Sequence, residues 1–269
     1  GDKKMMKSVF SERLESFGDI YSKDIELVCV AHPQSSYIDS LGREILNARQ
    51  DLELQWIQSL DDLRIVDEFL PASIDPEASK MLSDQIKESC GMLNQTLDCK
   101  YVGVRLLTLD KPMCPRFHVD QIPCRLLITL SGGGTEWIAN NDVDWKLFDD
   151  RTNLDAPLKE KKKVNQFKAG EWSLLKGGTW QSQFNGVVHR SPNIYEDRLM
   201  LSLDPIFDED QFKISTVKLS IEQLSVLYNS VDCTINISDA EGFGLATLES
   251  LATETPIIVN MTGGLQEQV

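Results

Sequence analysis

The chain has 269 residues, enough for one large domain or two of ordinary size, and its 41% of apolar residues can form a core. The formal net charge of −15 argues against a broad nucleic-acid surface and against anionic membranes, because both attract clustered Lys and Arg. No apolar run approaches the ~20 residues of a membrane span, and we expect no secretory signal. The six cysteines form no C-x-x-C pair, so we expect reduced thiols in a cytoplasmic protein.

The first hundred residues are predicted to be mainly helical. We expect residues 1–23 to be a helical lead-in and residues 25–31 (IELVCVA) to be a buried strand. Leu and Ile recur at helical spacing over residues 37–68, which predicts two or three helical segments. An Asp-Pro cap precedes an amphipathic pattern over residues 75–97. We expect these helices to pack on the outside of a β core.

The pattern changes after residue 100 and again near residue 211. Short strand-like runs separated by Gly, Pro, Asn and Asp are typical of an antiparallel sandwich or barrel. Beyond them the order becomes helix, strand, glycine-containing loop, helix and strand, which is an α/β pattern. We therefore predict three parts: 1–100 as a helical or α+β lead-in that packs on the core, 101–210 as the core, and 211–269 as a separate α/β segment.

A candidate metal site occurs in the second of these parts. His118 and Asp120 are two residues apart, so on a strand both side chains face the same side. His189 closes another apolar strand-like run, and the fold could bring it beside them. Two imidazoles and one carboxylate hold iron in oxygenase-type sites, and the same ligands suit zinc or manganese. The pattern is equally compatible with two ordinary, partly buried histidines.

Two further residues suggest a binding site for a carboxylate. Arg198 begins the strand-like run that follows His189, and a guanidinium can bind a carboxylate through two hydrogen bonds. A 2-oxoglutarate co-substrate needs such a partner at its far carboxylate. Ser202 falls on the same face of the run and could add a hydrogen bond. We therefore predict that Arg198 and Ser202 bind the co-substrate.

Three segments resemble an uncharacterised family, domain of unknown function 1826, over residues ~20–208. They are FHVDQIPCRLLITLSGGGTEWI, AGEWSLLKGGTW and GVVHRSP followed by DRLMLSLD. The order His-x-Asp, His, Arg also resembles the iron(II)- and 2-oxoglutarate-dependent oxygenases. This resemblance implies an α+β fold with a double-stranded β-helix core, also called a jelly-roll or cupin-like core. It further implies that His118, Asp120 and His189 are catalytic and hold Fe(II), and that 2-oxoglutarate pairs with Arg198.

The last ~55 residues resemble part of the donor-binding domain of retaining glycosyltransferases with two Rossmann-like domains. That family carries Glu-x7-Glu at the start of a helix, here Glu241 and Glu249, and Gly242 and Gly244 would let the backbone approach a nucleotide sugar. Residues 210–269 contain two lysines, no arginine and eight carboxylates, which would repel a nucleotide diphosphate. We expect a fragment, not a working transferase.

Three functions are consistent with these observations, in order of preference. The first is a non-haem Fe(II)- and 2-oxoglutarate-dependent oxygenase that hydroxylates a small molecule or a protein. The second is a cupin-like protein that binds zinc or iron without catalysis, and the third is a sugar-nucleotide glycosyltransferase fragment. The expected partner is a substrate, with neither nucleic acid nor membrane. Exposed strand edges in the last segment favour a homo-oligomer.

Overall fold

A computed structural model describes residues 5–49, 51–207, 221–229, 231, 233–236 and 245–259. The chain divides into two compact units, Gly1–Ile214 and Ser215–Val269. The strands and α-helices of the first unit are β1 (Lys7–Ser11), β2 (Ile25–Ala31), α1 (Ser35–Ala48), β3 (Glu53–Ser59), α2 (Val66–Phe69), α3 (Pro76–Leu97), β4 (Tyr101–Leu109), β5 (Cys124–Ser131), β6 (Glu136–Ile138), β7 (Asn165–Gln166), β8 (Glu171–Lys176), β9 (Val188–Arg190) and β10 (Arg198–Ile206). Short 3-10 helices lie at Leu14–Tyr21, Leu63–Ile65, Asn140–Asp142 and Trp145–Leu147.

Two sheets form the centre of the first unit. The larger sheet has seven strands in the order β1-β2-β8-β5-β10-β4-β3, and only the pair β1–β2 is parallel. The smaller sheet has three antiparallel strands in the order β7-β6-β9. From β5 onward the chain crosses between the two sheets: β5, β8 and β10 belong to the larger sheet, and β6, β7 and β9 belong to the smaller one. The predicted α+β fold with a jelly-roll core is confirmed.

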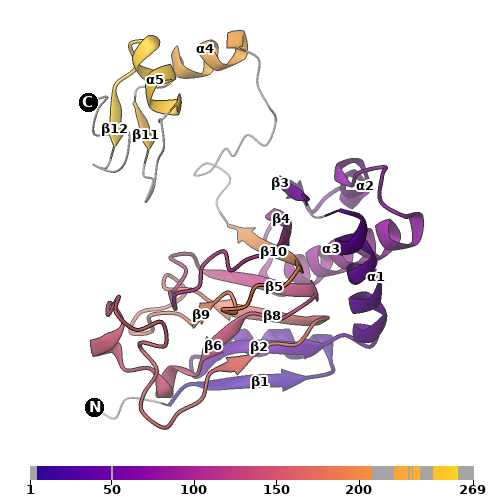
Figure 1. Ribbon diagram of the computed structural model, residues 1–269, viewed down its shortest axis with the longest axis vertical. Helices are drawn as coiled ribbons and strands as arrows, with labels where there is room; N and C mark the ends of the chain where they lie inside the picture. The colour runs from indigo at the N-terminus through magenta and orange to yellow at the C-terminus, as the bar shows by residue number, and fades with distance from the viewer. Residues whose placement is uncertain are drawn as a thin grey trace. The chain divides into compact units, whose positions relative to one another are not determined.

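One face of the larger sheet packs against helices. Alternate residues of its central strands, such as Val104, Leu126 and Leu201, share a buried core with side chains of α1 and α3. Figure 1 shows these two helices beside the sheet. The Asp75 carboxylate caps α3 by accepting hydrogen bonds from two N–H groups of its first turn, as the Asp-Pro pattern predicts. The prediction that helices cover a β core is therefore confirmed.

The other face of the larger sheet is turned toward the smaller sheet. Leu127, Leu175 and Met200 lie on this face and pack with Trp137 of β6 and with Phe167. Residues at even positions of β10 and odd positions of β4 and β5 point into the space between the sheets, because side chains alternate along a strand. The candidate site described below lies in this space.

Two predictions for the first hundred residues were wrong. The lead-in contains strand β1, which pairs with β2 before a 3-10 helix begins. The segment of β3 is a strand instead of a helix, and it pairs with β4 at the sheet edge. In β3 the buried side chains of Trp56 and Gln58 are two residues apart, which is the spacing of a strand. In both cases pairing with a free sheet edge outweighs the local helical pattern.

The second unit contains α4 (Ile221–Asn229), β11 (Thr234–Asn236), α5 (Leu245–Ala252) and β12 (Ile257–Val259), and the two strands are parallel. This order is the α/β order read from the sequence. The division of the chain at residues 100 and 210 stays a prediction. Among the helices of the described residues, none has both the length and the apolar character needed to cross a bilayer.

Candidate metal centre

Three side chains converge between the two sheets. His118 and Asp120 lie on the segment that precedes β5, and His189 is the middle residue of β9. One ligand atom from each side chain lies within 4.8 Å of the others. The Nε2 atom of His189 is 3.3 Å from Asp120 Oδ2, and that of His118 is 3.8 Å from Asp120 Oδ1. Side chains that share one metal ion have this spacing.

The two histidines are joined through their own backbones. The N–H of His118 donates to the carbonyl of His189, and the N–H of His189 donates to the carbonyl of His118, each over 3.0 Å. This antiparallel bridge lies next to the pairing of β9 with β6. The centres of the two imidazole rings are 4.5 Å apart. The fold therefore brings together two histidines that are far apart in the sequence.

Each imidazole is oriented by its Nδ1 atom. His118 Nδ1 lies 3.0 Å from the carbonyl oxygen of Arg116, and His189 Nδ1 lies 3.0 Å from that of Val187. A carbonyl oxygen only accepts, so each Nδ1 carries the hydrogen and each Nε2 keeps a lone pair for a metal ion. Burial and the nearby His189 lower the pKa of His118, which favours the neutral, metal-binding ring.

The third side chain of the cluster, Asp120, is held in place by Arg125. Arg125 Nη1 donates to Asp120 Oδ2 over 2.9 Å, while its Nε and Nη2 donate to the two oxygens of Asp204 over 2.7 and 2.8 Å. Burial alone would raise the pKa of Asp120, but protonated His189 and the guanidinium of Arg125 both lower it, and Arg125 keeps its charge when the imidazoles are neutral. The carboxylate is therefore ionised at neutral pH. Its Oδ1 accepts no hydrogen bond from any described residue, so it is available to a metal ion.

Glycines behind the Asp120 segment shape the site, and the sequence analysis did not connect them with it. The N–H of Gly178 donates to the carbonyl of Asp120 over 2.8 Å. A Cβ atom on Gly177 would lie 1.9 Å from the carbonyl oxygen of Ile122, so only glycine fits there. Gly186 has a φ of +97°, which also favours glycine. The glycine pair in LLKGGTW was the available signal, but it is also the signature of an ordinary turn.

The side chains of His118, Asp120 and His189 line a cavity of about 310 Å³. Leu107, Leu127 and Met200 supply apolar parts of its wall, and Ser202 lies on the same strand as Met200. Ser202 therefore lines the space in which a molecule bound to the metal would lie.

Arg198 is next to this cavity but does not line it. The residue is 1% exposed; its Nε donates to the carbonyl of Gly133 over 2.5 Å, and its Nη2 is 3.6 Å from the sulfur of Met200, which does line the cavity. The Nη1 atom is buried and has no hydrogen-bond partner in the described part of the chain. Burial lowers the pKa of the guanidinium to about 10, so the group is cationic at neutral pH. A buried cationic donor without a partner fits an anionic ligand.

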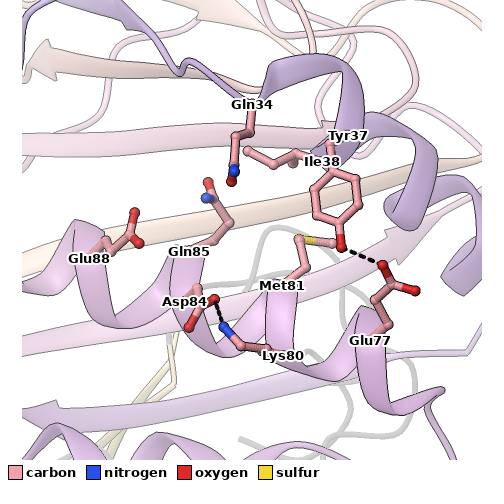
Figure 2. Close-up of a pocket in the computed structure, with 9 residues that line it drawn as sticks. All are labelled: Gln34, Tyr37, Ile38, Glu77, Lys80, Met81, Asp84, Gln85 and Glu88. Atoms are coloured by element: carbon pink, nitrogen blue, oxygen red, sulfur yellow. Dashed lines mark hydrogen bonds and ion pairs between the residues drawn. The ribbon is translucent and has the colours of Figure 1, made fainter.

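A second cavity, of about 350 Å³, lies between α1 and α3 and is drawn in Figure 2. Most of its polar side chains have hydrogen-bond partners. Tyr37 donates to Glu77 over 2.6 Å, and Lys80 donates to Asp84 over 2.6 Å, as the dashed lines in Figure 2 mark. Gln85 accepts a hydrogen bond from the buried Trp172. Within the described residues, the cluster with metal-binding geometry is the one at His118, not this one.

The residues predicted to bind a nucleotide sugar are only partly described. Glu241, Gly242 and Gly244 lie outside the described residues. Glu249 is an exposed residue of α5, and its carboxylate accepts a hydrogen bond from the Tyr228 hydroxyl over 3.1 Å. The role predicted for these four residues stays a prediction.

Two families match the chain, each over a different part. The family described as "Protein of unknown function (DUF1826)" matches residues 11–204. The family described as "Glycosyl transferases group 1" matches residues 214–269. Both matches confirm the resemblances noted in the sequence. No curated protein matches the chain.

Several solved structures, oxygenases among them, are similar to the chain at low identity. A dioxygenase for auxin oxidation in rice is 11% identical, with a TM-score of 0.44, over 76% of this chain and 84% of that chain. A prolyl-4-hydroxylase from Pseudomonas putida is 12% identical, with a TM-score of 0.41, over 71% of this chain and 91% of that chain. JOX2 in complex with 2OG, Fe and JA is 13% identical, with a TM-score of 0.43, over 80% of this chain and 82% of that chain.

Proposed function

We propose that this chain, which belongs to the DUF1826 family, is an oxygenase that uses iron(II) and 2-oxoglutarate to hydroxylate its substrate. One observation carries the proposal: ligand atoms of His118, Asp120 and His189 lie within 4.8 Å of one another in the lining of one cavity. Two neutral imidazoles and one carboxylate, with positions left open for substrate and oxidant, are the ligand set of non-haem iron oxygenases.

The residues present fit both the metal and the co-substrate. The two Nε2 lone pairs and Asp120 Oδ1 are available to iron, because the other polar atoms of these side chains are bonded elsewhere. The buried Nη1 of Arg198 lacks a partner, so Arg198 is the residue that would hold the far carboxylate of 2-oxoglutarate. Bound together, iron(II) and 2-oxoglutarate supply the oxidation, in which dioxygen converts 2-oxoglutarate to succinate and carbon dioxide and a substrate C–H bond becomes C–OH.

The chain's own residues position the ligands. Arg125 fixes the orientation of Asp120 and keeps it ionised, while the carbonyls of Arg116 and Val187 fix the two rings. Leu107, Leu127 and Met200 supply apolar surface beside the reacting region. We also propose a cytoplasmic location, which is supported by the fact that all six cysteines are free.

Anaerobic titration of the purified protein with Fe(II) and then 2-oxoglutarate tests the proposal. We expect the weak visible charge-transfer band of an iron-chelated 2-oxoacid. His189→Ala should abolish the band, because the metal loses a ligand. Arg198→Ala should keep iron binding but require about tenfold more 2-oxoglutarate, since one charge-assisted interaction is lost.

The matched control is Arg43→Ala, which removes one positive charge from an exposed position on α1. Its titration should match the wild type. Tight zinc binding without any band would contradict the oxygenase proposal and favour a metal-binding protein without catalysis.

A further inference from the structure

One guanidinium in the cavity lining has no partner among the described residues. Arg105 lies on β4, directly across from Ser202 of β10, and both residues line the cavity. Its neighbours Val104 and Leu106 are buried in the core on the helix-covered face, so Arg105 points to the opposite face. The side chain is partly exposed, and it forms no hydrogen bond or ion pair in the part of the chain that the structure describes.

The other two arginines of the cavity lining are fully engaged. Arg125 donates to both Asp120 and Asp204. Arg190 donates to Glu136 over 2.6 Å and to Asp155 over 3.1 Å, and its guanidinium carbon lies 4.1 Å from the centre of the Phe117 ring. Each of these cations therefore already has two carboxylate partners. Arg105 differs from both because its donors are all available.

Under the proposed function, Arg105 is the cation of the cavity lining that has no carboxylate in contact with it among the described residues. The two positive charges of iron(II) are balanced by Asp120 and by one carboxylate of 2-oxoglutarate. The second carboxylate of 2-oxoglutarate is balanced by Arg198, whose buried Nη1 needs a partner. Arg105 itself belongs to a protein whose formal net charge is −15. A cationic group kept free in such an acidic protein, on a cavity wall, is suited to bind an anion.

Resting on the proposed function, we infer that the substrate is a small carboxylic acid whose carboxylate is bound by Arg105. A single guanidinium supplies one charge and a planar pair of donors, which matches a carboxylate better than a phosphate dianion. The apolar body of the acid would lie against Leu107, Leu127 and Met200, which also line the cavity. A cavity of about 310 Å³ suits a small molecule.

Ligand-observed NMR on the protein loaded with zinc and 2-oxoglutarate tests this inference. Zinc uses the same ligands as iron, supports no oxidation and does not broaden the spectrum. The probes are small aliphatic and aromatic monocarboxylic acids at millimolar concentration, each paired with its methyl ester. We expect acids to bind at least about tenfold more tightly than their esters, and Arg105→Gln to abolish that preference. Arg43→Gln, an equal loss of charge at an exposed site on α1, should preserve it.

The affinity for 2-oxoglutarate is measured in parallel on the same variants. It should stay within twofold of wild type in Arg105→Gln. A tenfold loss there would show that Arg105 binds the co-substrate and would overturn the inference. The inference is equally overturned if acids and esters do not differ in the wild type, if no acid binds, or if the preference survives in Arg105→Gln. The iron–2-oxoglutarate band needs no acid, so its presence without an acid preference refutes this inference alone, whereas its absence refutes the proposed function.

Discussion

Two cavities of the first unit, one between the sheets and one between α1 and α3, are similar in size, about 310 and 350 Å³, and both contain acidic and basic side chains. They differ in how completely those side chains bond to each other. Between α1 and α3, Tyr37 and Lys80 donate to the two neighbouring carboxylates. Between the sheets, side-chain atoms of His118, Asp120 and His189 converge, and the guanidiniums of Arg105 and Arg198 have donors without acceptors among the described residues. A buried polar group without a hydrogen bond costs about 1–3 kcal/mol of stability. Donors and acceptors without partners therefore indicate a ligand site better than the mere presence of polar side chains does.

Replacing an acid in each cavity should give the largest contrast. Asp120→Asn keeps the shape of the side chain but removes the charge. The affinity for zinc or iron(II) should fall ~100-fold or more, because losing a residue that only hydrogen-bonds a metal ligand already costs about 10–100-fold. Asp84→Asn in the other cavity should leave that affinity within twofold. Titration calorimetry on the folded variants measures both, and equal affinities for the two variants would contradict the metal site.

Replacing Gly177, which lies behind the Asp120 segment, tests how rigidly the cavity lined by Asp120 is held. Gly177→Ala places a Cβ atom 1.9 Å from the carbonyl oxygen of Ile122, so the free energy of unfolding should drop by about 1–3 kcal/mol. The metal affinity should also fall, because the same segment carries Asp120. Gly91→Ala is the matched control: nothing lies within 4 Å of its Cβ position on α3, so unfolding should become harder by about 0.5–1 kcal/mol. Urea unfolding measures both, and an unperturbed Gly177→Ala variant would show that the segment can shift freely.

Lys176 is a buried cation whose ammonium group has hydrogen-bond acceptors, whereas the Nη1 of Arg198 has none among the described residues. Its Nζ donates to the carbonyl of Ser22 and to Gln181, and burial lowers its pKa from 10.5 to about 8. Between these two pKa values the unfolded chain holds the proton and the folded chain does not. The free energy of unfolding should therefore rise with pH in this window, by at most ~1.4 kcal/mol per pH unit. Lys176→Met should remove that rise; an identical pH profile for wild type and variant would refute this account.

The smallest effect is expected for the hydrogen bond shown in Figure 2 between Tyr37 and Glu77. Tyr37 is 45% exposed, so water replaces the lost partner. Tyr37→Phe should leave the midpoint of urea unfolding and the metal affinity unchanged. A measurable change in metal affinity would mean that the two cavities are coupled.

Local patterns in the sequence predict much of this fold. The helix that Asp75 caps and the strands that alternate around Val104 and Leu126 carry their signals within a few residues. Strand β3 was missed because its partner β4 lies elsewhere in the sequence, and pairing with that strand decides its conformation. The two-residue spacing of His118 and Asp120 is also a local signal, and it allowed both residues to be predicted as part of one site.

Partner choice across strands could not be predicted. The sequence does not show that Arg125 donates to Asp204 and Arg190 to Glu136, because these contacts depend on which strands become neighbours. For the same reason it did not single out Arg105, which has no such partner among the described residues. The assignment of Arg198 and Ser202 to the co-substrate stays a prediction.

The reciprocal backbone bridge between His118 and His189 has a consequence for folding. An ion held by both histidines would cross-link two distant parts of the chain and close a long loop, as a disulfide does. The unfolded chain lacks this arrangement, so the melting temperature of the first unit should climb with metal concentration. Thermal denaturation thus becomes an assay of site occupancy that works before any substrate is known.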